Sequence, residues 1–191
     1  DYTCMFTDSR GQELVQGTFC TPGQAGAMAL GVKKLINSMP LEEYREGDVF
    51  IVNDPWLLAG HLNDVCVMSP IFYKQRPVAF TACVFHHSDI GGRVASDNRQ
   101  VYEEGIFIPP LRLYESGVLN ESVLNLIRWN VRTPEEVTGD LRSQVAANHV
   151  CAQKVVEMLE DEGLDTLDDL ADEIIDRTEK SMREAISGIP N

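Results

Sequence analysis

Apolar residues follow two different patterns, one in the first ninety residues and another in the last seventy. In the first part they form short continuous runs, such as VFIV in GDVFIVNDP and the segments 65–73 and 78–87. Runs of this length, rich in Val, Phe and Ile and bounded by turn residues, are typical of β-strands. Because segments 65–73 and 78–87 are apolar on both faces, we expect them inside a sheet, joined by the KQRP turn.

The rest of the first part predicts a hairpin, a helix and a loop. Two β-prone runs, YTCMFTD and ELVQGTF, flank the turn SRGQ and predict the hairpin. The small, apolar stretch from Gln24 to Asn37 predicts the helix. Beyond DIGG the chain becomes polar and irregular, and Pro109 and Pro110 exclude regular structure in FIPPLRLY.

In the last seventy residues, apolar residues recur every three or four positions, which predicts amphipathic helices. Asn120 caps a short helix, ESVLNLIRW. Residues 133–136 have a capping-box pattern with a proline, at the start of a longer helix that Gly163 ends. A last helix starts at Thr166 and ends before Gly188. The apolar positions of the longer helix are Val137, Leu141, Val145, Ala152, Val156 and Leu159.

Together these elements predict an α+β fold. We expect a central mixed β-sheet formed by roughly the first 90 residues, then a long irregular loop, then a helical C-terminal segment. Residues 1–119 would form the α+β region that carries any functional site. Residues 120–191 would form the helical segment, packed on the same domain.

Composition narrows the classes of function. A formal net charge of −14 argues against nucleic acid or an anionic membrane as partner, because either needs a basic face. No apolar run approaches the roughly 20 residues of a membrane helix, and no signal-peptide pattern is present, so we expect a cytoplasmic protein. Five widely spaced cysteines without zinc-ribbon spacing indicate reduced, packed thiols.

Histidines give the strongest chemical signal. The chain has four, and three of them, His61, His86 and His87, lie between GHLND and HHSDIGG, each near an aspartate. Imidazole and carboxylate ligands together suit zinc, manganese or iron. His61 and Asp64 stand three apart on a turn that begins with glycine, so both side chains can converge on one ion.

Strand alternation restricts the second histidine. If residues 78–87 are extended, His86 and His87 point to opposite faces of the sheet. Only one of them can therefore face a site that is reached along this strand, and the other is a supporting group or a packed side chain. The residues alone leave that choice open.

Other chemistry is less well supported. Neither G-x-G-x-x-G nor G-x-x-x-x-G-K-[ST] is present, so this chain alone is not expected to bind ATP phosphates. DIGG offers backbone N–H groups to an anion, although a glycine pair is more often only a tight turn. Cys66 and Cys83 lie in apolar strands without an activating base, which argues against a nucleophilic cysteine.

Five motifs, in order, carry a family resemblance: GDVFIVNDP, GHLNDVCVMSPIF, HHSDIGG, VYEEGIFIPPLRLY and NVRTPEEVTGDLRSQVAA. They resemble the B-type subunit of the hydantoinase B family, which includes subunits or domains of ATP-dependent hydantoinases and 5-oxoprolinases and related subunits of acetone and acetophenone carboxylases. Such subunits are much longer than 191 residues, and this chain starts without Met. We therefore expect a fragment or a processed chain.

The resemblance implies a set of site residues. His61, Asp64 and His86 would fall on the family's metal-binding positions, and no cofactor-binding residue is expected. Asp54 of NDP and Asp89 of SDIGG would lie at recurrent motifs and orient ligands or substrate as catalytic residues. The metal would be zinc or manganese, with iron as a third candidate.

The resemblance also implies partners and a reaction. An A-type partner subunit would bind ATP and activate a carbonyl oxygen by phosphorylation, and the B-type subunit of the hetero-oligomer would complete the reaction at its metal. The substrate would be a small carbonyl compound or cyclic amide. We expect cyclic amide hydrolysis, with ketone carboxylation and a non-catalytic structural subunit as the alternatives.

Overall fold

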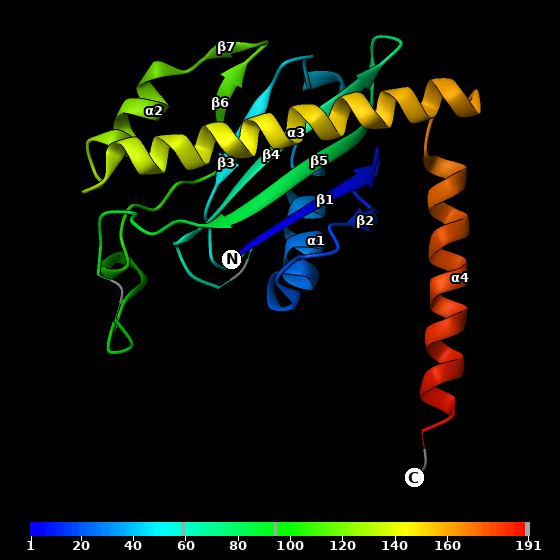
Figure 1. Cartoon of the computed structure of the whole chain (residues 1–191), viewed down its shortest axis with the longest axis horizontal. Coiled ribbons are helices and arrows are strands. Elements are labelled where there is room, and N and C mark those ends of the chain that lie inside the picture. Colours follow the sequence, from blue (N-terminus) through cyan, green and yellow to red (C-terminus); the bar gives the residue numbers. More distant parts are fainter. Residues whose placement is uncertain (59, 94, 190–191) are drawn as a thin grey trace.

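The computed structural model describes residues 1–58, 60–93 and 95–189 and contains a seven-stranded sheet flanked by helices (Figure 1). The strand order is β2-β1-β5-β4-β3-β6-β7. The strands are β1 (Tyr2–Asp8), β2 (Glu13–Gln16), β3 (Val49–Val52), β4 (Asp64–Tyr73), β5 (Arg76–His86), β6 (Leu111–Glu115) and β7 (Val118–Leu119). The α-helices are α1 (Pro22–Ile36), α2 (Glu121–Arg128), α3 (Pro134–Glu162) and α4 (Asp168–Ser187), and the short 3₁₀ helices are η1 (Leu41–Glu43) and η2 (Val101–Glu103).

The predicted α+β class is confirmed, and the two apolar segments form the central strands β4 and β5. Two details differ from the prediction. Each described strand pair is antiparallel, where a mixed sheet was expected. The sheet also extends beyond residue 90, because β6 and β7 lie in the expected loop. Pro109 and Pro110 precede β6 instead of lying within it, and there the missing N–H interrupts no ladder.

Helices cover the two faces of the sheet (Figure 1). On one face, Met28 and Val32 of α1 pack with Phe80 and Val84 of β5 in a single buried cluster. On the other face α3 runs across the sheet, and Val137 and Leu141 belong to a second buried cluster together with residues of β3, β4 and α2. The two helices α1 and α3 therefore bury opposite faces of the central strands.

The middle of α3 meets the sheet through polar side chains. The Gln144 amide donates to the carbonyl oxygens of Val65 and Cys83, at 2.8 and 3.1 Å. The Asn148 amide donates to the carbonyl oxygen of Val67 at 2.9 Å and accepts from the Thr81 hydroxyl at 3.2 Å. Both side chains are fully buried, so α3 is fixed to β4 and β5 by hydrogen bonds as well as by apolar contacts.

The last helix lies mostly away from the sheet (Figure 1). Gly163 adopts the left-handed conformation and ends α3, as predicted. Near its start, α4 contacts the N-terminal hairpin, where Arg10 pairs with Asp172 at 2.8 Å, and Ala171 of the same turn is buried. No helix in the described part of the chain combines the length and the apolar character that crossing a membrane requires.

Replacing Gln144 with leucine tests the polar attachment of α3. Leucine preserves volume but removes the acceptor of the buried His87 ring, which bonds Gln144 at 3.1 Å. We expect a loss of about 1–3 kcal/mol in the free energy of unfolding, measured by denaturant titration. The same change at the exposed Gln153 of α3 should cost less than about 0.5 kcal/mol. Equal effects at the two positions would contradict the assigned role.

Candidate metal centre

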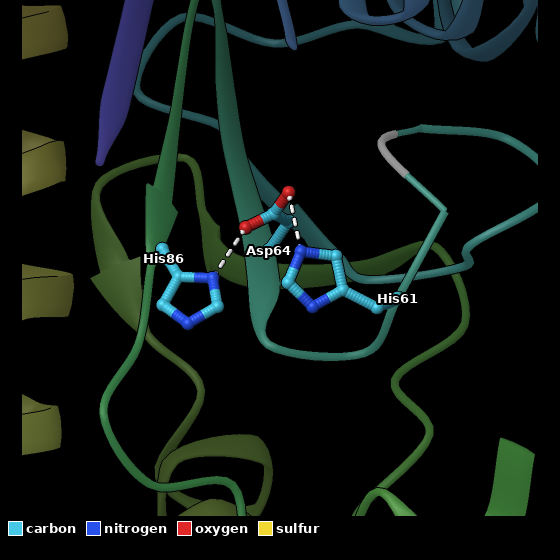
Figure 2. Close-up of side chains that lie close together, drawn as sticks. All are labelled: His61, Asp64 and His86. Carbon is cyan, nitrogen blue, oxygen red and sulfur yellow. Dashed lines mark hydrogen bonds and ion pairs between the residues drawn. The ribbon is translucent and has the colours of Figure 1, made fainter. Parts of the chain in front are cut away.

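Three of the predicted site residues meet at one end of the central strands (Figure 2). Asp64 begins β4, His86 ends β5, and the two are direct partners in the antiparallel register. His61 lies on the turn that precedes β4. One oxygen of Asp64 lies 3.0 Å from His61 Nε2, and the other lies 3.0 Å from His86 Nδ1. A single carboxylate therefore bridges the two imidazole rings.

Strand alternation separates His86 from His87 as expected. The His86 side chain belongs to the cluster and is 36% exposed, while His87 is fully buried on the α3 side, against Gln144. Burial lowers the pKa of His87, because the charged imidazolium would lose its hydration there, although the bond to Gln144 acts in the opposite direction. His87 is thus a neutral core residue, and His86 is the histidine that faces the candidate site.

The carboxylate of Asp64 is buried while the two rings remain accessible. Its side chain is 2% exposed, against 37% for His61. In the described part of the chain, no arginine or lysine pairs with Asp64. A buried carboxylate without a cationic partner is costly unless hydrogen bonds or a bound cation compensate it. The His86 ring hydrogen-bonds one oxygen of Asp64 and His61 Nε2 lies 3.0 Å from the other, and a metal ion would supply the cation.

The geometry is compatible with a single divalent ion. Each of the three residues offers one ligand atom within 4.8 Å of those of the other two. Atoms that share a zinc ion at bond lengths of about 2.0–2.2 Å lie roughly 3–4 Å apart, so small side-chain rotations would close the set. The ring centroids of His61 and His86 are already 4.9 Å apart. Two imidazoles and one carboxylate form a donor set that suits zinc, manganese or iron.

The structure does not bring Asp54 and Asp89 into this cluster. Asp54 follows β3, and its side chain accepts the backbone N–H of Trp56 at 2.9 Å, which stabilises a local turn. Asp89 lies in the loop after β5 and is nearly buried. A direct catalytic role for either residue stays a prediction.

Asp89 connects that loop to the start of α3. Its carboxylate accepts the backbone N–H groups of Gly91, Arg132 and Thr133 and the Arg132 guanidinium. Burial alone would raise its pKa, but these hydrogen bonds and the Arg132 charge outweigh burial and hold the pKa of Asp89 below the ordinary aspartate value. The predicted capping box is not formed, because the Thr133 side chain makes no cap hydrogen bond. The backbone N–H of Thr133 donates to Asp89 instead.

The two glycines of DIGG allow close backbone packing. A Cβ on Gly91 would lie 2.0 Å from the carbonyl oxygen of Asn130, and one on Gly92 would lie 2.1 Å from the carbonyl carbon of Glu104. The Gly91 N–H bonds Asp89 within the loop. This loop is therefore packed against α2–α3 and η2, which gives the glycine pair a structural explanation that needs no bound anion.

A small cavity lies beside the cluster. It has a volume of about 230 Å³ and is lined by His61, Asn63, Arg93, Ala95, Ser96, Asn98 and Glu104. A neighbouring hollow of about 370 Å³ shares Asn98 and Glu104 with it and is bordered by the exposed Trp56. Larger hollows of about 490 and 570 Å³ lie around Tyr44 and contain none of the three cluster residues. Of these four hollows in the described part of the chain, the cavity at His61 is the one that a residue of the cluster lines.

Two further polar residues contact the turn between His61 and Asp64. Asn53 and Glu104 both bond the backbone of Leu62. The sequence patterns did not identify them as site residues. An asparagine directly after the apolar run VFIV was the available signal for Asn53, since a polar residue at the end of a buried strand needs partners. No comparable signal marked Glu104.

Comparison with known proteins identifies the family and supports the fold. The family described as Hydantoinase B/oxoprolinase matches the chain over residues 1–191. A protein of a Pseudomonas species described as the B component of a putative D-/L-hydantoinase is 33% identical over 100% of this chain and 33% of its own length. The crystal structure of the ATP-dependent caprolactamase from Pseudomonas jessenii has a TM-score of 0.90 at 32% identity, covering 100% of this chain and 33% of that one. The acetophenone carboxylase delta subunit of Aromatoleum aromaticum is 27% identical over 94% of this chain and 27% of its own.

The α+β fold that carries the cluster is thus shared with the ATP-dependent caprolactamase. The chain belongs to the hydantoinase B/oxoprolinase family, which confirms the resemblance seen in the motifs. It spans about a third of the length of the hydantoinase and caprolactamase relatives.

Replacing Asp89 with asparagine tests its structural role. We expect a loss of about 1.5–3 kcal/mol in the free energy of unfolding near pH 7, because a charged acceptor of several hydrogen bonds is lost. Since the folded-state pKa is lowered, the stabilisation is present above the ordinary aspartate pKa and disappears as pH falls through the folded value. The difference from wild type should therefore shrink between about pH 5 and pH 2, measured by urea titration.

Asp97→Asn is the matched control for this variant. The Asp97 carboxylate also forms an ion pair with an arginine, Arg93, at 2.7 Å, but the Asp97 side chain is 74% exposed. Its replacement should change stability by less than about 1 kcal/mol. A pH-independent difference between Asp89→Asn and wild type would contradict the assignment.

Proposed function

We propose that this chain is the metal-bearing part of a B-type subunit that hydrolyses a cyclic amide, acting on a carbonyl group activated by an ATP-using partner. The single observation that carries the proposal is the His61–Asp64–His86 cluster beside a cavity. The names of its relatives, a hydantoinase component and an ATP-dependent caprolactamase, supply the reaction class.

An open site with three protein ligands is the arrangement expected of a catalytic metal. His61, Asp64 and His86 would hold zinc, manganese or iron, and the bound ion would polarise the carbonyl oxygen or activate water. His87 and His149 are not alternative ligands, since His87 faces α3 and His149 lies on the exposed side of that helix. The His61 and His86 rings are partly exposed, which argues against the alternative of a structural subunit. In that alternative, a fully coordinated ion would only hold the strands together.

The protein groups around the cluster have separate tasks in this proposal. Asp64 keeps both rings oriented, because each of its oxygens holds one imidazole. The cavity would take the substrate next to His61, between Asn63 and Glu104. Trp56, exposed at the neighbouring hollow and stacked on Phe107, offers an apolar surface for the rest of a ring.

The activating step is assigned to a partner. The chain has no phosphate-binding glycine motif, and its net charge of −14 does not favour a polyanionic nucleotide. We therefore place ATP on an A-type subunit of a hetero-oligomer. The caprolactamase of Pseudomonas jessenii has a beta subunit among the relatives of this chain, which supports such a division of labour.

Ketone carboxylation is the second candidate. The similarity to an acetophenone carboxylase delta subunit favours it, and the same three ligands would serve, because both reactions develop negative charge on an oxygen. The hydrolase is preferred because the hydantoinase and caprolactamase relatives are more similar in sequence.

Metal content tests the assignment directly. The purified protein, prepared without chelator, should contain about one zinc, manganese or iron ion per chain by plasma mass spectrometry. His61→Ala and His86→Ala should each lose most of this metal, because two ligands rarely hold an ion in a site built for three. In complex with the ATP-using partner, both variants should also lose ATP-dependent activity.

His149→Ala is the control, since His149 lies on the exposed face of α3, outside the cluster. It should keep both metal and activity. Assembly of each variant is checked by size-exclusion chromatography. A wild-type protein without metal would contradict the proposal and favour a structural role for the chain.

A further inference from the structure

Each peptide group between His61 and Asp64 is held by a different neighbour. The Leu62 N–H donates to Glu104 Oε2 at 2.9 Å, and the Leu62 carbonyl oxygen accepts from the Asn53 amide at 2.7 Å. The Asn63 carbonyl oxygen accepts the His87 N–H at 2.8 Å. These peptide groups connect His61 to Asp64, so three separate segments fix the orientation of the turn. The buried Leu62 side chain anchors it further.

Asn53 supplies one of these contacts from the end of β3. It is fully buried, and its amide also donates to the Ile106 carbonyl oxygen at 3.0 Å and accepts the Ile108 N–H at 2.6 Å. All the polar atoms of its side chain therefore bond backbone groups. Asn53 links the turn to the segment before β6 and has no group left for substrate.

Glu104 supplies another contact from the residue after η2. Its backbone is held by close packing against Gly92 and by the Gly91–Gly105 bridge. Its carboxylate bonds the Leu62 N–H, and no ion pair of Glu104 occurs in the described part of the chain. Glu104 is not part of the His61–Asp64–His86 cluster, whose ligand atoms converge. A carboxylate that bonds a peptide N–H is a strong acceptor, so this contact restrains the turn effectively.

We infer that Glu104, together with Asn53, is a positioning residue of the metal centre, which holds the Leu62 peptide so that His61 stays aligned with Asp64. This inference rests on the proposed function, because it concerns affinity for the ion. Without the contact, the turn would have to be ordered when the ion binds, and that cost reduces affinity. Supporting residues of this kind typically change metal affinity by about 10–100-fold.

Binding of Co²⁺ by the purified protein, in its complex where one forms, tests the inference. Affinity is measured by competition with a chelator, and the visible absorption of bound Co²⁺ reports the geometry of the ligands. Glu104→Ala should weaken Co²⁺ binding about 10-fold or more and alter the absorption spectrum. Glu104→Gln should bind within about threefold of wild type, because its amide oxygen can accept the same N–H.

The glutamine variant separates positioning from direct ligation. If Glu104 were itself a ligand, replacing its carboxylate by an amide would weaken binding nearly as much as alanine, and that result would overturn the inference. Glu103→Ala is the matched control, since the Glu103 carboxylate bonds the Arg99 N–H and faces Arg93, away from Leu62. It should leave Co²⁺ affinity unchanged.

A purely structural role is tested by thermal unfolding of the metal-free proteins. If Glu104→Ala lowers the melting temperature but binds Co²⁺ with wild-type affinity, the inference is wrong. A wild-type protein that binds no Co²⁺ overturns the proposed function and this inference together. Normal binding by wild type with equal affinity in Glu104→Ala overturns the inference alone.

Discussion

The register of β4 against β5 is the constraint on which the candidate site depends. Ten residue pairs fix it, from Asp64↔His86 at one end to Tyr73↔Arg76 at the other. A slip of one residue would turn every side chain of one strand to the opposite face. Asp64 would then lose its contact with His86, and apolar residues would meet the wrong helix. The same hydrophobic alternation that builds the core therefore also places Asp64 and His86 beside one another.

The polar contacts of α3 reinforce this register from one side. Gln144 and Asn148 bond carbonyl oxygens of Val65, Val67 and Cys83, on both central strands, so they recognise a particular alignment of the backbone. Apolar contacts alone would tolerate small shifts, whereas hydrogen bonds to buried carbonyl groups do not. The His61–Asp64–His86 cluster lies at the end of strands that are held by both kinds of interaction.

Features that depend on local pattern could be predicted from the sequence. Strands β1 to β5, the helix start at Asn120 and the helix end at Gly163 follow from periodicity and turn chemistry, whereas β6 and β7 lie where a loop was expected. The expected convergence of His61 with one histidine of the adjacent pair has the same local basis. The resemblance then selected His86, and the structure places that side chain in the cluster. Features that depend on distant partners could not be predicted. Buried Gln144 and Asn148 interrupt the apolar stripe of α3, and the residues that satisfy them lie on β4, β5 and the loop after β5, far away in the sequence.

The glycines of the loop after β5 affect how this family should be compared. Gly91, Gly92 and Gly105 bring backbone segments so close that a methyl group has no room at any of the three positions. We expect these glycines to be invariant among relatives with quite different substrates, because steric exclusion acts on all of them alike. In an alignment, invariance at these positions would reflect close packing around the loop. It would carry no information about which molecule is bound. Variation at cavity residues such as Asn98 and Trp56 is the better guide to substrate.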